Sequence, residues 1–86
     1  MKISDIIKDR IDVAGIRYWA GDNISSVLEE GDIDLLIDEA AEKFEAVLDS
    51  LIIDRANDPN SKDTGRRLAK MYINEIMSGR YYPGPK

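Results

Sequence analysis

The stretch Asp58–Arg80, DPNSKDTGRRLAKMYINEIMSGR, decides the fold because it combines a turn, a helix start, a basic cluster and a helix stop. Its first three residues, Asp58–Asn60, are typical of a turn, since proline presets φ and Asp and Asn side chains bond nearby backbone amides. Thr64 is suited to the N-cap of the following helix, and Gly79 to the position just after its end. The sequence therefore predicts a helix over Gly65–Ser78. As the first helical residue, Gly65 is expected to accept proline with a gain in stability.

One side of this predicted helix is apolar, because apolar residues recur at every fourth position. They are Leu68, Tyr72 and Ile76, followed one position later by Ala69, Ile73 and Met77. An apolar face of this width has to be covered, so we expect the helix to pack against another element.

The element before the turn is predicted to be the longest helix, running over Ile33–Ile53 with Asp32 as its cap. Its apolar residues form one continuous stripe, which consists of Ile33, Leu36, Ile37, Ala40, Phe44, Val47, Leu48, Leu51 and Ile52. Its outward face is acidic and carries Asp34, Asp38, Glu42, Glu45 and Asp49. Two such helices joined by a turn predict an all-α fold, a small helical bundle built around an antiparallel helix hairpin. The predicted packing interface consists of Leu36, Phe44, Leu48, Leu51, Leu68, Tyr72 and Ile76.

The N-terminal part is predicted to hold two further helices and a connector. Ser4 can cap a first helix, which ends near Gly15. The short aromatic segment Ile16–Ala20 is expected to be a packed connector. Asn23 offers an N-cap and Ser26 begins an S-x-x-E capping box, so a second helix is expected to start nearby and to run to position 30.

The composition is typical of one small folded domain. The 86 residues are 43% hydrophobic and 34% charged, which allows a modest core. We expect residues 1–31 to form the N-terminal helix and connector, residues 32–80 the hairpin, and residues 81–86 a C-terminal tail. The sequence shows neither an apolar run near the length of a membrane span nor a signal-peptide pattern, so a cytoplasmic location is expected and a membrane partner is not.

The sequence contains no Cys and no His. This excludes disulfides, thiolate nucleophiles, imidazole bases and ordinary zinc sites within these residues. We therefore expect this chain to hold no metal or cofactor, to contribute no catalytic residue, and to be inactive by itself.

Charge is divided unevenly along the chain. Residues 1–53 hold 5 basic and 13 acidic residues, a net charge of −8, whereas residues 54–86 hold 7 basic and 4 acidic residues, a net charge of +3. The two parts are expected to attract each other. Because the whole chain is acidic and repels phosphate, nucleic acid is not an expected partner.

Four cations gather at the start of the predicted helix Gly65–Ser78, which we call the motif helix. They are Lys62, Arg66, Arg67 and Lys70. The dipole at a helix N-terminus favours anions, so an anion site is one interpretation. The other is that these cations pair with nearby acidic residues or contact a neighbouring subunit. We favour the second interpretation because charge runs usually serve solvated faces.

Two other clusters have a structural interpretation. The acidic and amide residues Asp54, Asp58, Asn60 and Asp63 lack the ligand spacing, central glycine and final glutamate of a calcium loop, so they predict a plain turn. The aromatic pairs could stack on a base or a pterin, but aromatics near chain links more often anchor packing, which we expect here. These pairs are Tyr18 with Trp19 and Tyr81 with Tyr82.

The second half of the chain resembles GTP cyclohydrolase I. Members of that family carry a turn, an Asp-Thr-Pro-Arg-Arg-like start, then Ala-Lys-Met-Tyr, and a helix that ends near Phe-Ser-Gly. The matching positions here are Asp63–Arg67, Ala69–Tyr72 and Ser78–Gly79. The resemblance extends more loosely back through Phe44–Leu51, and it departs from the family at Gly65, where proline is usual.

This resemblance implies that the chain corresponds to the N-terminal helical region, with a role in packing and assembly. Complete members hydrolyse GTP to 7,8-dihydroneopterin triphosphate in pterin, folate or 7-deazaguanine biosynthesis, using zinc held by two cysteines and a histidine in a portion that would follow Lys86. The implied partners are a second copy, through self-association, or that catalytic portion. The alternative is a stand-alone helical interaction module that binds a cyclohydrolase or another protein. Whether the polypeptide continues after Lys86 decides between these hypotheses.

Overall fold

The computed structural model describes residues 2–83, and its regular structure is helical throughout that range. The elements in chain order are α1 (Ile3–Ala14), the 3₁₀ turn η1 (Ser25–Val27), α2 (Asp32–Ser50), α3 (Thr64–Met71), the π-helical segment η2 (Tyr72–Ile76) and α4 (Ser78–Tyr81). The predicted all-α fold is confirmed. Helix α4 ends at Tyr81, and residues 84–86 of the predicted tail lie outside the described range.

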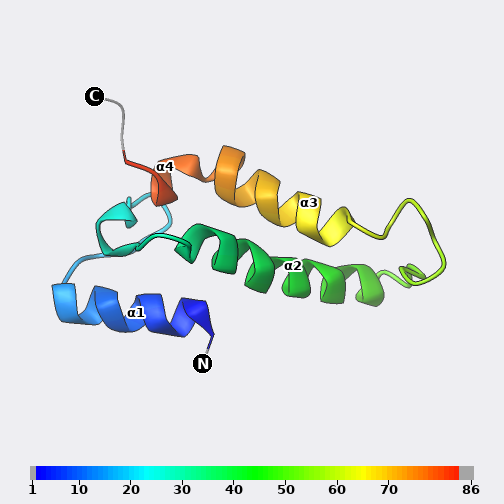
Figure 1. Ribbon diagram of the computed structural model, residues 1–86, viewed down its shortest axis with the longest axis horizontal. Coiled ribbons are helices and arrows are strands. Elements are labelled where there is room, and N and C mark those ends of the chain that lie inside the picture. Colours follow the sequence, from blue (N-terminus) through cyan, green and yellow to red (C-terminus); the bar gives the residue numbers. More distant parts are fainter. Residues whose placement is uncertain (1, 84–86) are drawn as a thin grey trace.

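The helices form a layer in which α2 lies between α1 and α3 (Figure 1). The chain reverses through residues 51–63, and α3 then runs back along α2 (Figure 1). One core cluster lies between α1 and the connector, and contains Ile3, Ile7, Ile11 and Ile24. The second lies between α2 and the motif helix, and contains Ile37, Ala41, Ala69 and Ile73. Leu36 and Tyr81 pack against both clusters and so link the two halves of the layer.

Small residues bring α2 and α3 into close contact. Ala69 is completely buried, and a β-carbon placed on Gly65 would lie only 3.0 Å from the carbonyl oxygen of Ala41 and 2.6 Å from Cγ of Glu45. The helix also begins at Thr64, so Gly65 is its second residue. The expectation that proline would stabilise position 65 is therefore wrong, because the added ring atoms would meet the backbone of α2.

Helices α1 and α2 end in the same way but with different residues. In each, the two amides after the last turn bond back to carbonyls of that turn, and the pivotal residue adopts positive φ, the pattern of a Schellman cap. At the end of α1 this residue is Gly15, with φ 67°, as the predicted helix end requires. At the end of α2 it is Ile52, with φ 62°. This helix stops at Ser50, before the predicted Ile53, and a β-branched residue adopts the left-handed conformation only with strain.

The motif helix is interrupted where the sequence predicts one continuous element. The Met77 amide bonds to the Tyr72 carbonyl oxygen at 2.8 Å, a five-residue span that inserts one extra residue into the turn. The chain then continues into α4, so Gly79 is a helical residue and not the predicted cap, since its φ is not positive. Thr64 is not the predicted N-cap either, because its hydroxyl donates to the Asn60 carbonyl oxygen.

Near the N-terminus, a long-range contact replaces the predicted local cap at Ser4, and the second predicted helix is shortened. Glu39 of α2 accepts hydrogen bonds from the amide and the hydroxyl of Ser4, at 3.0 and 2.6 Å, so the carboxylate that serves the start of α1 comes from another helix. The helix predicted to follow Asn23 is reduced to the single turn η1, after which Leu28 is already extended. Among residues 2–83, none of the helices has the length and apolar character needed to cross a membrane.

Candidate functional site

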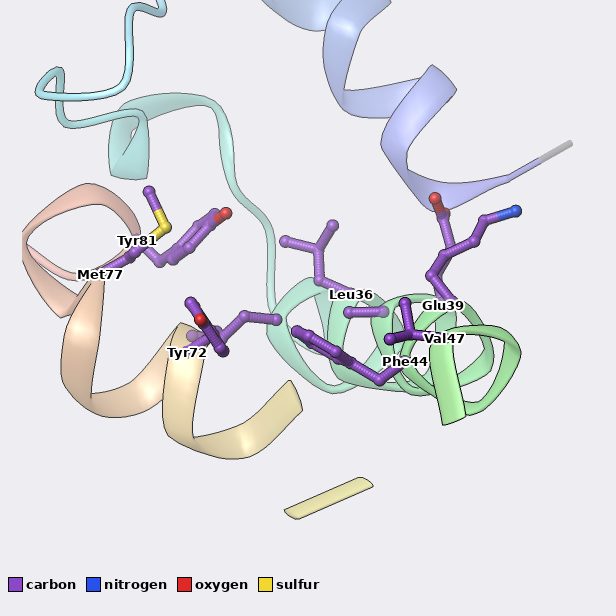
Figure 2. Close-up of a pocket in the computed structure, with 10 residues that line it drawn as sticks. Leu36, Glu39, Phe44, Val47, Tyr72, Met77 and Tyr81 are labelled. Carbon is purple, nitrogen blue, oxygen red and sulfur yellow. The ribbon is translucent and has the colours of Figure 1, made fainter. Parts of the chain in front are cut away.

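An apolar groove of about 400 Å³ lies between α2 on one side and η2 and α4 on the other (Figure 2). Its lining consists of Leu36, Glu39, Ala40, Lys43, Phe44, Val47, Tyr72, Ile73, Met77 and Tyr81. Figure 2 shows Phe44 and Val47 on the α2 wall, with Tyr72, Met77 and Tyr81 on the opposite wall. Apolar and aromatic side chains dominate both walls, so the groove is suited to an apolar ligand or segment.

A stacked aromatic pair connects the two walls of the groove. The rings of Phe44 and Tyr72 have centroids 5.3 Å apart and planes inclined by 26°. Tyr72 nevertheless remains 40% exposed, and Val47 on the next turn of α2 is 52% exposed. The pair therefore joins the two helices while leaving apolar surface in contact with water.

The exposed apolar surface continues to the C-terminal end of α2. Leu51, one turn beyond Val47, is 63% exposed, and Ile52 is 90% exposed. We call Phe44, Val47, Leu51, Ile52 and Tyr72 the α2 strip. The charged residues that line the groove are Glu39 and Lys43, one of each sign. Arg55, which follows α2, bonds Asp49 at 2.7 and 3.0 Å.

The residues of the predicted packing interface do not share one environment. Leu48 is buried, Leu36, Phe44 and Leu68 are half-buried, and Leu51, Tyr72 and Ile76 are exposed. The contact between α2 and the motif helix is instead centred on Ile37, Ala41, Gly65, Ala69 and Ile73. The predicted stripe of α2 was therefore broader than the buried face, and its outer edge supplies Phe44, Val47, Leu51 and Ile52 of the α2 strip.

The two arginines of the cationic cluster bond different partners. Arg66 donates to the Asp38 carboxylate of α2, and this bond raises the pKa of the guanidinium. Arg67 donates to the Asn60 carbonyl oxygen and the Thr64 hydroxyl, at 3.4 and 3.3 Å. Lys62 and Lys70 are exposed. The contact of Arg66 with the acidic helix agrees with the favoured interpretation of this cluster.

Sequence reasoning missed a partly buried ion pair between Arg10 of α1 and Asp32 of α2. Asp32, 4% exposed, accepts hydrogen bonds from Arg10 and from the Glu29 amide, and Arg10 also donates to the Val27 carbonyl oxygen at 3.0 Å. Burial would raise the pKa of the Asp32 carboxyl, but these two hydrogen bonds outweigh it, so its pKa lies below the ordinary value. Asp32 is thus the first residue of α2 and an anchor for α1, and it does not have the predicted capping geometry.

Only one of the four aromatics predicted to anchor packing does so. Tyr81 packs against both core clusters, whereas Tyr18, Trp19 and Tyr82 are exposed. The Arg17 guanidinium lies 4.1 Å from the centroid of the Trp19 ring, and Arg17 also bonds Asp22. In the segment 16–20, Ile16 packs against the first core cluster, whereas Tyr18 and Trp19 are exposed, so the predicted packed connector is packed at its first residue and not at its aromatic residues.

Arg80 holds that segment in place through backbone contacts. Its guanidinium donates to the carbonyl oxygens of Trp19, Tyr18 and Asp22, at 2.6, 3.1 and 3.2 Å. The Ile24 amide donates in turn to the Arg80 carbonyl oxygen at 2.7 Å. The end of the motif helix and the N-terminal connector are thus tied together.

The acidic turn before α3 has a structural role. Asp58 accepts from the Asn60 amide and the Ser61 hydroxyl at 2.9 and 2.8 Å, which is the predicted turn chemistry. Across residues 2–83, acidic side chains do not gather in a group of three or more that could hold a metal ion.

No protein family, curated protein or solved structure matches this chain.

Proposed function

We propose that this chain is the N-terminal helical part of a GTP cyclohydrolase I-like protein and that its role is packing and assembly. The full-length protein would convert GTP to 7,8-dihydroneopterin triphosphate, with the zinc and the catalytic residues supplied by the portion after Lys86. The observation that carries the proposal is the α2 strip, where Val47, Leu51 and Tyr72 are all at least 40% exposed. An isolated small domain gains nothing from exposing such a surface, whereas an assembly part needs it.

The positions that carry the resemblance support a packing role. Ala69 is completely buried against α2, Arg66 bonds Asp38, and Tyr72 stacks on Phe44. Each of these contacts joins the motif helix to α2. The motif residues thus hold the two helices together. This is the role expected of a region that packs beside a catalytic portion and performs no chemistry.

Reconstitution from two polypeptides tests the proposal. The chain is mixed with a separately produced catalytic portion of a GTP cyclohydrolase I that lacks its own helical region, and formate release from GTP is measured. We expect neither polypeptide alone to match the activity of the mixture. Val47→Asp should reduce the rescue, because it places a charge in the docking surface while removing little from the core.

The matched control is Val13→Asp on α1, where the side chain is 91% exposed and lies outside the groove. This variant should rescue as well as the unsubstituted chain. Two folded halves that show no gain in activity when combined would contradict the proposal.

A stand-alone interaction module is the second candidate. The observation that favours it is that α1, α2 and the motif helix share two linked core clusters, so the chain has a core of its own. Adding the chain to an intact cyclohydrolase distinguishes the two candidates. A module should change the assembly or rate of the intact enzyme, whereas an N-terminal part should act only on an enzyme that lacks this region.

A further inference from the structure

We propose that a second, smaller cavity binds a compact aromatic anion, such as a carboxylate attached to a single ring. This cavity lies between α1, α4 and the connector that joins α1 to η1. The inference goes beyond the proposed packing function and does not depend on it. It is carried by the size of the cavity, by its apolar lining and by the sign of the charges that line it.

Four segments of the chain meet at this cavity, which has a volume of about 220 Å³. It lies where the two core clusters join, because Leu36 of α2 and Tyr81 of α4 line it and pack against both clusters. The connector and α4 lie side by side at one end of the helical layer (Figure 1). Arg80 ties them together by donating to the carbonyl oxygens of Trp19 and Tyr18, at 2.6 and 3.1 Å. Contacts within the chain therefore hold the walls of the cavity in place.

The apolar part of the cavity has room for one aromatic ring. An apolar cavity of about 150 Å³ in another protein holds a benzene molecule, and the present cavity is larger. Its apolar lining consists of Ile7, Ile11, Ile24 and Leu36, together with Tyr18 and Tyr81. Aliphatic and aromatic side chains of this kind favour a flat apolar ligand over a strongly hydrated one.

The charged residues that line the cavity have the same sign. They are Lys8 and Arg80, and none of the described lining residues is acidic. Lys8 is exposed and forms no ion pair among residues 2–83. The Arg80 guanidinium donates to uncharged carbonyl oxygens, so contact with a carboxylate does not offset its charge. An anion in the cavity would be attracted by both residues, and a cation would be repelled.

Two acidic residues adjoin the cavity without lining it. Asp22 is paired with Arg17 at 2.8 Å. Glu39 accepts a hydrogen bond from Ser4 and lines the larger groove between α2 and η2. In the described structure neither carboxylate pairs with Lys8 or Arg80, so both cations remain able to attract an anionic ligand.

Benzoate, benzamide and benzylamine test the inference with the full 86-residue chain, because they are similar in size and differ in charge at neutral pH. Amide chemical shifts of the isotopically labelled chain are followed during each titration at low salt. Benzoate should bind at least about tenfold more tightly than benzylamine and about threefold more tightly than benzamide. It should shift the amides of Ile11, Ile24 and Tyr81. Added salt should weaken the binding of benzoate and leave that of benzamide unchanged.

Substitutions at two lysines locate the anionic group. Lys8→Gln should weaken the binding of benzoate by about threefold or more and should not affect benzamide. The side chain is exposed, so the fold is retained. Lys43→Gln is the matched control, since Lys43 is also exposed but lines the larger groove. It removes the same charge and should leave benzoate binding unchanged. Lys8→Arg should restore most of the binding, because it keeps the charge.

Four outcomes would overturn the inference. Absence of any shift with benzoate at about 20 mM would mean that the cavity does not bind this class of ligand. Equal binding of benzylamine would remove the charge argument. Equal losses in Lys8→Gln and Lys43→Gln would reduce the effect to net charge. Shifts confined to Val47 and its neighbours would place the ligand in the larger groove. None of these outcomes bears on rescue by the catalytic portion, so the proposed function is tested separately.

Discussion

Gly65 lies against the backbone of Ala41, so close that a β-carbon at position 65 would come within 3.0 Å of the Ala41 carbonyl oxygen. We expect Gly65→Ala to lower the free energy of unfolding by about 1 to 3 kcal/mol, because α2 and α3 would have to move apart. Thermal or urea unfolding measures the change. Gly79→Ala is the matched control, since no neighbouring atom lies within 4 Å and alanine in a helix should be neutral or stabilising. Equal effects at the two positions would contradict the close contact.

The conformation of Ile52 predicts a stabilising substitution. Ile52→Gly should raise the free energy of unfolding by about 1 kcal/mol, because glycine adopts positive φ without the penalty that a β-branched residue incurs. Little apolar burial is lost, since the side chain is 90% exposed. Gly15→Ala should have the opposite sign, because it places a β-carbon at φ 67°. Denaturant unfolding of both variants gives the two values, and a destabilised Ile52→Gly chain would show that the conformation is not strained.

Leu48 and Leu51 form a matched pair on α2 that tests which side of the helix is buried. Leu48 is 7% exposed and Leu51 is 63% exposed. We expect Leu48→Ala to cost about 2 to 4 kcal/mol through lost burial and a cavity, and Leu51→Ala to change stability by no more than about 0.5 kcal/mol. Chemical denaturation of the two single variants decides the matter. Reversed magnitudes would place the other edge of the helix in the core.

The Asp32 carboxylate predicts a component of stability that depends on pH. Its pKa is lower in the folded chain than the ordinary value of about 3.9, so the folded state favours the charged form. This stabilisation is present above pH 4 or so and is lost as the pH falls through the folded pKa. Asp32→Asn should therefore destabilise the chain near pH 7, and the difference from the unsubstituted chain should shrink on acidification. Melting curves from about pH 7 to about pH 2 test this, and a difference that does not change with pH would exclude a role for the charge.

Arg80 predicts the local stability of the connector. Arg80→Gln removes a guanidinium that bonds three carbonyl oxygens, so the segment Tyr18–Asp22 should open more often. We expect the Asp22 amide, which bonds the Trp19 carbonyl oxygen at 2.8 Å, to exchange about tenfold faster with solvent deuterium. Amides in the middle of α2 should keep their exchange rates. Unchanged exchange at Asp22 would mean that the connector is held by other contacts.

The helices were predictable because their signals are local. Apolar spacing placed α2 and the motif helix, Gly15 marked the end of α1, and Asp58 marked the turn. The face that makes the closest contact was not predictable in the same way. Hydrophobic patterns give most weight to large side chains, whereas Ala41 and Gly65 determine how closely the helices approach.

The polar contacts that the sequence analysis did not predict join residues that are far apart in the sequence. Arg10 lies 22 residues from Asp32, and Ser4 lies 35 residues from Glu39. No spacing rule within a helix relates such positions, so Asp32 and Ser4 were read as local caps. The predicted stripe of α2 already contained Phe44, Val47, Leu51 and Ile52. The sequence did not show which residues of that stripe are buried and which are exposed; the structure does.

The extra residue in η2 sets the direction in which the residues after it point. Successive residues of an α-helix are turned by roughly 100°, so everything after Tyr72–Ile76 is rotated relative to an uninterrupted helix. This rotation is compatible with Arg80 reaching the connector and Tyr81 reaching both core clusters from the same short α4. A single-residue deletion in η2 would therefore rotate α4 about the helix axis by roughly 100°. It would leave the composition of the helix almost intact and turn its last contacts away from their partners.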